Sequence, residues 1–259
     1  MLNFNGELLS ENSTFLNQEN RGFRYGDSLF ETIKVVNQKI YFWEDHYLRL
    51  MASMRILRMQ IPMSFTMEYL ESQILETIIS SALENSPVRI RLTIFRNNGG
   101  LYHPKTNEVS FIIEAKKLEN PFFILNAENY EIELFKDFYV NPDMLSTLKT
   151  NNRIINVVGS IYAKENNYQN CILLNNQKMV VEALNGILRK KIIEIVGKLD
   201  TYTIEETTIS PFELQKADEL FITNAIVGIQ PVTKYRKKNY ATSVAKDLLG
   251  KLNAAARLG

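Results

Sequence analysis

Three features of the sequence could together bind a carbonyl cofactor: a lysine, a glutamate and the start of a basic helix. Lys149 lies in "MLSTLKTNNRIINVV", between a loop and a predicted helix. Glu182 lies in "VVEAL", where apolar neighbours predict burial, and a buried carboxylate needs a cationic or hydrogen-bonding partner. The segment "NGILRKK" turns at Asn185-Gly186 and opens a helix, whose free N–H groups suit a phosphate.

A lysine amine, a buried carboxylate and a phosphate cup are the groups that pyridoxal phosphate (PLP) requires. The lysine binds the cofactor aldehyde, the carboxylate keeps the pyridine nitrogen protonated, and the helix start holds the phosphate. Each group also has an ordinary structural interpretation, since a lysine before a helix is usually a solvated charge. Spacing alone therefore leaves both interpretations open.

Composition excludes several other classes of function. The 259 residues include 30 basic and 29 acidic side chains. The resulting net charge of +1 does not indicate binding to nucleic acid or to an anionic membrane. Cys171 is the single cysteine, so neither an internal disulfide nor a cysteine-based metal cage is expected. The only histidines, His46 and His103, lie far apart, which disfavours a metal site or a His-based triad.

The sequence contains no apolar run near the ~18 residues of a membrane span. Its first residues, "MLNFNGELLSENS", lack the basic and apolar regions of a signal peptide. We therefore expect a cytoplasmic protein.

Strand and helix patterns alternate along the whole chain, which predicts a two-domain α/β protein. The pattern breaks in the polar stretch "KKLENPFF" around Pro121. We expect an N-terminal α/β domain at residues 1–118, a linker at 119–124, and a cofactor-binding, barrel-like α/β domain at 125–259.

The first domain should begin with a strand pair that turns at Asn37-Gln38, followed by a helix from Glu44 and a second helix capped by Ser64. The pattern "VRIRLTIF" then alternates cleanly, so its apolar residues share one face of a strand. Arg89 and Arg91 share the other face. That face is either solvated or suited to a substrate carboxylate.

In the second domain, a helix is expected from about 151 to 164, followed by a hairpin that turns at Asn175-Asn176. The helix 187–196 should end at Gly197, and Ser210 should cap a short helix that begins at Pro211. A final helix is expected from about Thr242.

The order of several motifs resembles the class IV aminotransferase family, the fold-type IV PLP enzymes. The resemblance covers nearly the whole chain. Its motifs are "RGFRYGDSLFETIKV", in which Ser28 stands where a glycine is usual, and then "EDHYLRL", "LKTNNRI", "VVEALNG", "GILR" and "ADELFITNAIVGIQPV".

The resemblance implies a D-amino-acid aminotransferase-like fold, a small amine substrate and a homodimer. Lys149 would bind the cofactor aldehyde and act as the catalytic base. The other implied cofactor ligands are Arg49, Glu182, Gly186, Ile187, Leu188, Thr223 and Asn224. Tyr25 and Arg153 would lie at the substrate, beside Arg89 and Arg91. Without the resemblance, Arg49 could be a surface arginine, and Thr223 and Asn224 could simply end a strand in a turn.

The chain departs from the family pattern after Glu182. Family members usually insert an apolar strand, a loop and a return strand before the helix that binds the phosphate. Here "EALNG" leads directly into "ILRKK", so a segment on the order of 20 residues is expected to be absent. We therefore expect a truncated second domain.

Three reactions or roles remain open. "NNR" at 151–153, "NGILR" and Asn224 resemble 4-amino-4-deoxychorismate lyases, which release 4-aminobenzoate and pyruvate. "FETIKV" resembles the branched-chain and D-amino-acid aminotransferases. The shortened connection also allows a non-catalytic member that keeps only the fold.

Overall fold

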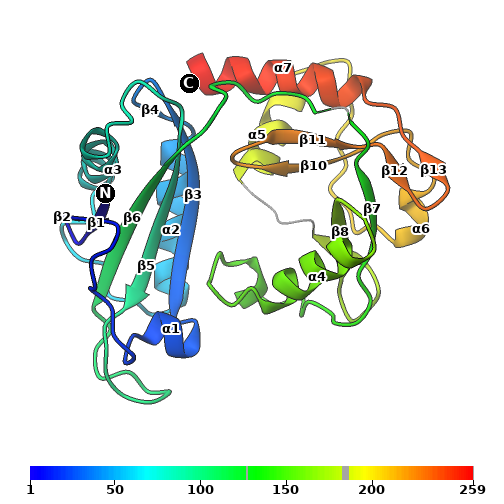
Figure 1. Ribbon diagram of the computed structural model, residues 1–259. Coiled ribbons are helices and arrows are strands. Elements are labelled where there is room, and N and C mark those ends of the chain that lie inside the picture. Colours follow the sequence, from blue (N-terminus) through cyan, green and yellow to red (C-terminus); the bar gives the residue numbers. More distant parts are fainter. Residues whose placement is uncertain (127, 183–186, 259) are drawn as a thin grey trace. The chain divides into compact units, whose positions relative to one another are not determined.

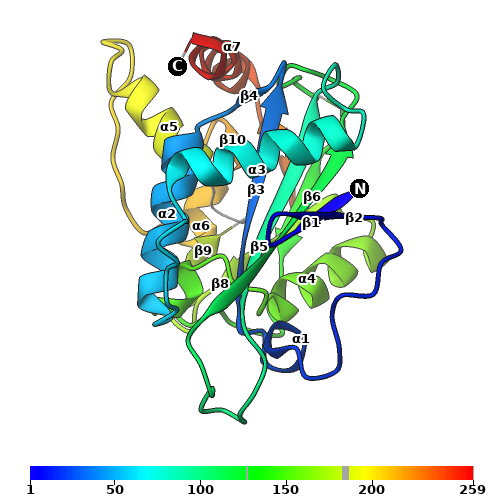
Figure 2. The same cartoon turned by 90° about the vertical axis from the view of Figure 1, so that its left-hand side faces the viewer.

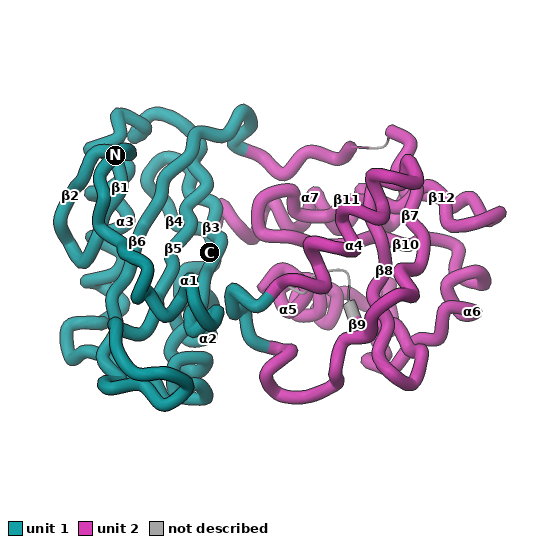
Figure 3. Tube along the Cα trace, turned by 60° about the horizontal axis from the view of Figure 1, so that its bottom comes forward, with its two compact units in different colours: residues 1–121, 148–152 teal, residues 122–147, 153–259 magenta. Residues whose placement is uncertain are grey.

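The computed structural model describes residues 1–126, 128–182 and 187–258. The chain forms two compact units (Figure 3). Unit 1 comprises Met1–Pro121 and Leu148–Asn152, and unit 2 comprises Phe122–Thr147 and Arg153–Gly259. The segment that carries Lys149 therefore folds with unit 1, although the chain on both sides of it folds with unit 2.

Unit 1 is built on a six-stranded antiparallel sheet with the strand order β2-β1-β6-β5-β3-β4 (Figure 1). Its strands are β1 (Leu2–Phe4), β2 (Glu7–Leu9), β3 (Ser28–Val36), β4 (Lys39–Ile40), β5 (Val88–Arg96) and β6 (Val109–Lys117). The predicted hairpin is confirmed, because Asn37 and Gln38 join β3 to β4 with φ values of 49° and 60°. Two such residues are typical of a type I′ turn.

The predicted alternation in β5 is also confirmed. The alternation stops at Phe95 and Arg96, which are both buried, but before them the buried side chains are Val88, Ile90, Leu92 and Ile94. Arg89 and Arg91 alternate with them and therefore lie on the opposite face of the sheet.

Three helices complete unit 1: α1 (Arg21–Tyr25), α2 (Trp43–Ile56) and α3 (Met67–Ser80). Figure 2 shows α2 and α3 lying across one face of the sheet. The prediction that Ser64 caps the second helix is wrong. The Tyr69 N–H donates to the Thr66 hydroxyl at 3.1 Å, so Thr66 is the cap. Ser64 lies instead in a turn, in which the Phe65 N–H donates to the Pro62 carbonyl at 3.0 Å, and the Phe65 side chain that follows is buried in the core.

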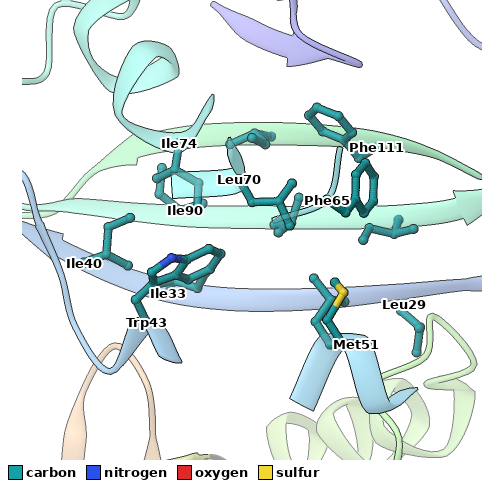
Figure 4. Close-up of a cluster of buried hydrophobic side chains, with 14 of the residues drawn as sticks. Leu29, Ile33, Ile40, Trp43, Met51, Phe65, Leu70, Ile74, Ile90 and Phe111 are labelled. Atoms are coloured by element: carbon teal, nitrogen blue, oxygen red, sulfur yellow. The ribbon is translucent and has the colours of Figure 1, made fainter. Parts of the chain in front are cut away.

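A single apolar core fills the space between this sheet face and the helices (Figure 4). Its members include Leu29, Ile33, Ile40, Trp43, Met51, Phe65, Leu70, Ile74, Ile90 and Phe111. The core fixes the position of β3, whose residues carry much of the candidate site.

A charged cluster consists of Arg21 of α1, Asp27 directly before β3, and Arg96 at the end of β5, and is called here the Asp27 cluster. Asp27 Oδ2 accepts hydrogen bonds from Arg21 Nε at 2.8 Å and Arg96 Nε at 2.9 Å. Both guanidinium groups are nearly buried, and their other hydrogen bonds go to the chain around them. Arg21 donates to the carbonyls of Gly99, Leu101 and Tyr102, and Arg96 to the carbonyls of Leu57 and Arg58 and to the Asn107 side chain.

Unit 2 contains a five-stranded mixed sheet with the order β13-β12-β7-β8-β9 and a separate hairpin, β10-β11. The strands are β7 (Glu131–Leu134), β8 (Asn170–Leu174), β9 (Val180–Glu182), β10 (Leu220–Asn224), β11 (Gly228–Val232), β12 (Lys234–Tyr235) and β13 (Lys238–Asn239). The predicted hairpin at Asn175-Asn176 is confirmed, since β8 and β9 pair antiparallel around it.

The helices of unit 2 are η1, a 3-10 turn (Leu145–Thr147), α4 (Ile154–Glu165), α5 (Ile187–Val196), α6 (Pro211–Leu214) and α7 (Ser243–Leu258). The predicted cap of α6 is confirmed, because Ser210 and Glu213 form a reciprocal capping box. Helix α4 begins at Ile154 rather than near 151, since the preceding residues pair with β3.

Among the helices in the described part of the chain, none has both the length and the apolar composition needed to cross a membrane. The division into domains at residues 1–118 and 125–259, with a linker at 119–124, stays a prediction.

Candidate active site

Lys149 is held beside the first residues of β3 by backbone hydrogen bonds. The Phe30 N–H donates to the Lys149 carbonyl at 2.8 Å, and the Asn151 N–H donates to the Ser28 carbonyl at 3.1 Å. Strand β4 pairs only with the far end of β3, at Val35 and Val36, so this part of the edge is open to another partner. Residues 148–152, the lysine segment, act here as a short extra strand.

Side chains also fix the lysine segment. Leu148 is buried in the core of unit 1, and Arg91 Nη2 donates to Asn151 Oδ1 at 3.0 Å. Asn152 packs against Gly26, where a Cβ atom would lie 2.1 Å from Asn152 Oδ1. Gly26 also has a φ of 63°, so this close approach depends on glycine.

The Lys149 amine shares an aromatic ring with a guanidinium group. Lys149 Nζ lies 4.6 Å and Arg91 Cζ lies 4.0 Å from the centre of the Phe30 ring. The separation of Lys149 Nζ from Arg91 Cζ is therefore no larger than the sum of these two distances. Cation–π attraction stabilises both contacts, and an anion bound by Arg91 would lie near the lysine amine.

Further basic side chains lie on the same face of the sheet. Arg89 is paired in register with Lys34 on β3 and with Lys116 on β6, whereas Arg91 is paired with Thr32 and Glu114. Burial lowers the pKa of Lys34 to about 8. This face is suited to an anionic ligand because cations aligned on neighbouring strands repel each other until an anion neutralises them.

Burial also lowers the pKa of Arg91, an effect that nearby Glu114 opposes and that Arg89 reinforces. Tyr25, another predicted substrate residue, ends α1. Its ring packs under the Arg21 guanidinium at 4.9 Å and beside Tyr102 at 5.7 Å. The ring is therefore part of the packing around the Asp27 cluster.

Arg49 approaches β3 from α2 and is held by a buried glutamate. Its Nε donates to Glu31 Oε1 at 2.8 Å, and its Nη2 donates to Glu31 Oε2 at 2.5 Å. His46, one helical turn before Arg49, places Nδ1 2.7 Å from Glu31 Oε2. Arg49 is therefore more than a solvated surface arginine. Glu31, His46 and Arg49 are called here the Glu31 cluster.

The charge state of Glu31 follows from these partners. Burial alone would raise its pKa, but hydrogen bonds and charge from His46 and Arg49 outweigh burial and hold the pKa below its ordinary value of 4.5. The carboxylate is therefore ionised at neutral pH. Because an ionised carboxylate only accepts hydrogen bonds, His46 Nδ1 carries the proton.

In unit 2, helix α5 packs against strand β10. The side chains of Ile187 and Leu188 are buried, while their backbone N–H groups belong to the first turn, which has no partners within the helix. Thr223 is half-buried near the end of β10. Asn224 is exposed, and its Oδ1 accepts from the N–H groups of Ile226 and Val227 at 3.0 and 2.9 Å, which ends the strand in a turn.

Glu182 is the last residue of β9, opposite Leu173 on β8. Its side chain and the whole of Gly186 lie outside the described residues, as does the predicted Asn185-Gly186 turn. Arg153 directly precedes α4 in unit 2. The predicted site residues are therefore divided between the units: Lys149, Arg49, Tyr25, Arg89 and Arg91 belong to unit 1, and the others to unit 2.

Sequence reasoning missed Glu31, Phe30 and Asn151. For Glu31 a signal was present, because it alternates with Leu29 and Ile33 and so occupies a core-facing position where an apolar residue is expected. For Phe30 and Asn151 no local signal exists, since their contacts join segments about 120 residues apart in the chain.

Within the described ranges, no group of three or more histidine, cysteine, aspartate or glutamate side chains could hold a metal ion. In unit 1, the amine of Lys149 suits an aldehyde and the guanidinium of Arg49, held on one edge by Glu31, suits an anion. In unit 2, the free N–H groups at the start of α5 also suit an anion.

Comparison with known proteins agrees with this chemistry. The family model "Amino-transferase class IV" matches residues 28–185 and 182–235. The break between the two matched pieces falls at 182–185, where a family segment is predicted to be absent.

Among curated relatives, an aminodeoxychorismate lyase from Vibrio harveyi is 22% identical over 238 residues, covering 82% of this chain and 84% of the relative. A D-alanine aminotransferase from Listeria innocua is 23% identical over 262 residues, covering 88% of this chain and 85% of the relative. The two proteins have different reactions, and their identities to this chain are nearly equal.

Among solved structures, the branched-chain aminotransferase of Thermoproteus uzoniensis, determined with norvaline, superposes with a TM-score of 0.86 at 20% identity. The match covers 97% of this chain and 92% of that one. The predicted α/β fold is confirmed.

Proposed function

The chain belongs to the class IV aminotransferase family, whose members are PLP-dependent enzymes, and from this premise we propose that it is a 4-amino-4-deoxychorismate lyase. In this reaction the substrate loses its enolpyruvyl group as pyruvate and leaves 4-aminobenzoate.

The observation that carries this proposal is the basic sheet face beside Lys149. Alanine and branched-chain amino acids have one carboxylate, whereas 4-amino-4-deoxychorismate has two. Arg91 lies on the same aromatic ring as Lys149, and Arg89 lies on the same face among further basic residues. Two guanidinium groups match a dianionic substrate better than a monoanionic one. The lyase-like "NNR" after the lysine and the Vibrio harveyi relative support the same reaction.

The described residues fit the cofactor in two respects. Lys149 offers an amine on a fixed segment, and Arg49 uses only Nε and Nη2 on Glu31, which leaves Nη1 for an anion. The family resemblance implies Arg49 as a phosphate ligand in unit 1, and Gly186, Ile187 and Leu188 at the start of α5 as phosphate ligands in unit 2. Glu182 would hold the pyridine nitrogen, with Thr223 and Asn224 beside the cofactor. When bound, PLP supplies an electron sink for the carbon that loses a proton.

The chain's own residues would then act on the substrate. Lys149 would take a proton from the substrate and return it, because a positioned amine can act first as a general base and then as a general acid. Arg89, Arg91, Tyr25 and Arg153 orient the substrate, the two sheet arginines through its carboxylates.

An aminotransferase is the second candidate, and a specific observation favours it: the "FETIKV" motif resembles the aminotransferases, and the Listeria innocua relative is one. A non-catalytic role is the third candidate, because the predicted connection after Glu182 is shortened. We also propose a homodimer, as the family resemblance implies, and a cytoplasmic location.

Visible absorption of the purified protein with added PLP tests the proposal, with wild type beside Lys149→Ala. After dialysis, the wild type should keep an absorption band above roughly 400 nm, because a lysine condensed with the cofactor aldehyde absorbs there. The variant should lack this band. Lys105→Ala, a change at an exposed lysine in a loop of unit 1, serves as the matched control and should behave as wild type.

Product assays then separate the reactions. Release of pyruvate and 4-aminobenzoate identifies the lyase, and amino transfer to a 2-oxo acid identifies the aminotransferase. A folded wild type without the band would contradict both.

A further inference from the structure

Glu31 is an anomaly in the core of unit 1. Its side chain is 2% exposed, and it projects from β3 on the same side as the core residues Leu29 and Ile33. Taking a carboxylate out of water is costly unless charged partners compensate. An apolar side chain at this position would give a stable core without that cost, so the carboxylate calls for another explanation.

The partners of Glu31 come from one face of α2. His46 and Arg49 are three residues apart, so both project towards β3 from the same side of the helix. Glu31 Oε1 accepts from Arg49 Nε, and Oε2 accepts from Arg49 Nη2 and His46 Nδ1. The carboxylate thus binds the guanidinium through two parallel hydrogen bonds, which fix the plane of the guanidinium as well as its position.

The remaining edge of Arg49 faces a different environment. The Arg49 side chain is 26% exposed, against 2% for both Glu31 and His46. Among the described residues, the hydrogen bonds of the Arg49 guanidinium all go to Glu31 through Nε and Nη2. Nη1 and the second Nη2 hydrogen therefore form a pair of donors that Glu31 does not use, on a side chain that is partly exposed. A guanidinium presented in this way matches two oxygens of a phosphate.

We propose that Glu31 and His46 are positioning residues that hold the Arg49 guanidinium in the orientation needed to bind the cofactor phosphate. This inference rests on the proposed function, in which Arg49 binds that phosphate. Glu31 acts through Arg49 and touches neither cofactor nor substrate. His46 supports Glu31 through its hydrogen bond to Oε2, which restricts rotation of the carboxylate.

The test compares two ligands that differ only in the phosphate. Apo-protein is titrated with PLP and with pyridoxal, and the absorption change of each gives a Kd. In Glu31→Gln, the Kd for PLP should rise about tenfold or more, as expected when a hydrogen bond to a charged group is lost. The Kd for pyridoxal should change by less than about twofold, because pyridoxal has no phosphate for Arg49 to bind.

Glu44→Gln is the matched control. It removes a carboxylate from the same helix, at an exposed position in the first turn. It should leave both Kd values as in wild type. A double change, Glu31→Gln with Arg49→Gln, should bind PLP no more weakly than Arg49→Gln alone, because Glu31 acts only through Arg49.

Each outcome decides the matter. Equal weakening of PLP and pyridoxal in Glu31→Gln would assign Glu31 to the fold alone and overturn the inference, as would additive losses in the double variant. If Glu31→Gln does not fold, Glu31→Asp gives the same comparison, since a carboxylate one methylene shorter cannot keep both Arg49 and His46. A wild type that binds no PLP would overturn the proposed function itself, which separates that failure from the failure of a variant.

Discussion

Asp27 and Glu31, four residues apart in unit 1, each accept hydrogen bonds from two basic side chains. The two clusters differ in what the remaining donors of those basic side chains bind. In the Asp27 cluster, the remaining donors of Arg21 and Arg96 bind backbone carbonyls and an amide, and both side chains are nearly buried. In the Glu31 cluster, the Arg49 side chain is 26% exposed, and only Nε and Nη2 of its guanidinium donate hydrogen bonds among the described residues.

The destination of the remaining donors therefore distinguishes a buried ion pair that holds loops together from one that presents a cation. Burial and pairing alone do not, because both clusters have them. A buried ion pair adds little net stability, but removing one of its partners is costly. Altering each cluster in the same way should therefore show whether it acts on stability or on cofactor binding.

The largest effect is expected for Asp27→Asn. The change leaves two guanidinium groups almost buried without their shared carboxylate, and should lower the free energy of unfolding by about 3 kcal/mol. Urea unfolding of the apo-protein measures this loss. The ratio of the Kd values for PLP and pyridoxal should stay as in wild type; a changed ratio would remove the distinction between the clusters.

Glu31→Gln should lower the free energy of unfolding by less, about 2 kcal/mol at pH 7. Because the folded protein holds the Glu31 pKa below 4.5, its contribution is fully present above that pH and is lost as the pH falls through the folded pKa. Urea unfolding between pH 7 and pH 3 should therefore show wild type and variant converging in acid. A constant difference across this range would contradict the prediction.

Replacing each arginine by lysine sharpens the comparison. Arg21→Lys cannot reach all the carbonyls that Arg21 binds, and should cost about 1 kcal/mol of stability without a selective loss of PLP. Arg49→Lys should show the reverse, with PLP binding reduced more than pyridoxal binding. Thermal unfolding and the two titrations on the same samples provide the readouts, and equal behaviour of the two variants would be evidence against separate roles.

The smallest effect is expected in unit 2, at the exposed pairs that Glu194 forms with Lys190 and Lys191. Glu194→Gln should change the free energy of unfolding by no more than about 0.5 kcal/mol, because water and salt screen such pairs. A loss of several kcal/mol in urea unfolding would show that unit 2 also relies on fixed charges.

The sequence predicted much of this fold, because local patterns determine much of it. Alternation in β5, the Asn37-Gln38 turn and the Ser210 cap each depend on neighbouring residues alone. The strands β1, β2, β12 and β13 were not predicted, since each has only two or three residues, which is too short for a strand pattern to be recognised.

The candidate site divides in the same way. Arg89 and Arg91 follow from strand alternation, and Lys149 and Arg49 from motifs. The attachment of Lys149 to β3 could not be predicted, because it pairs residues 28–30 with 149–151. Ser64 illustrates a smaller limit of the prediction: it is a suitable cap residue, but it lies in a turn, and Thr66, two residues later, caps the helix.

The lysine segment also determines how the polypeptide can be divided. Because residues 148–152 fold with unit 1, the chain crosses between the units three times, after 121, 147 and 152. A cut after Pro121 would leave the first fragment with an unfilled strand edge and the second with the five residues that fill it. The two fragments would therefore be a complementing pair, in which the second donates a strand, and with it the lysine, to the first.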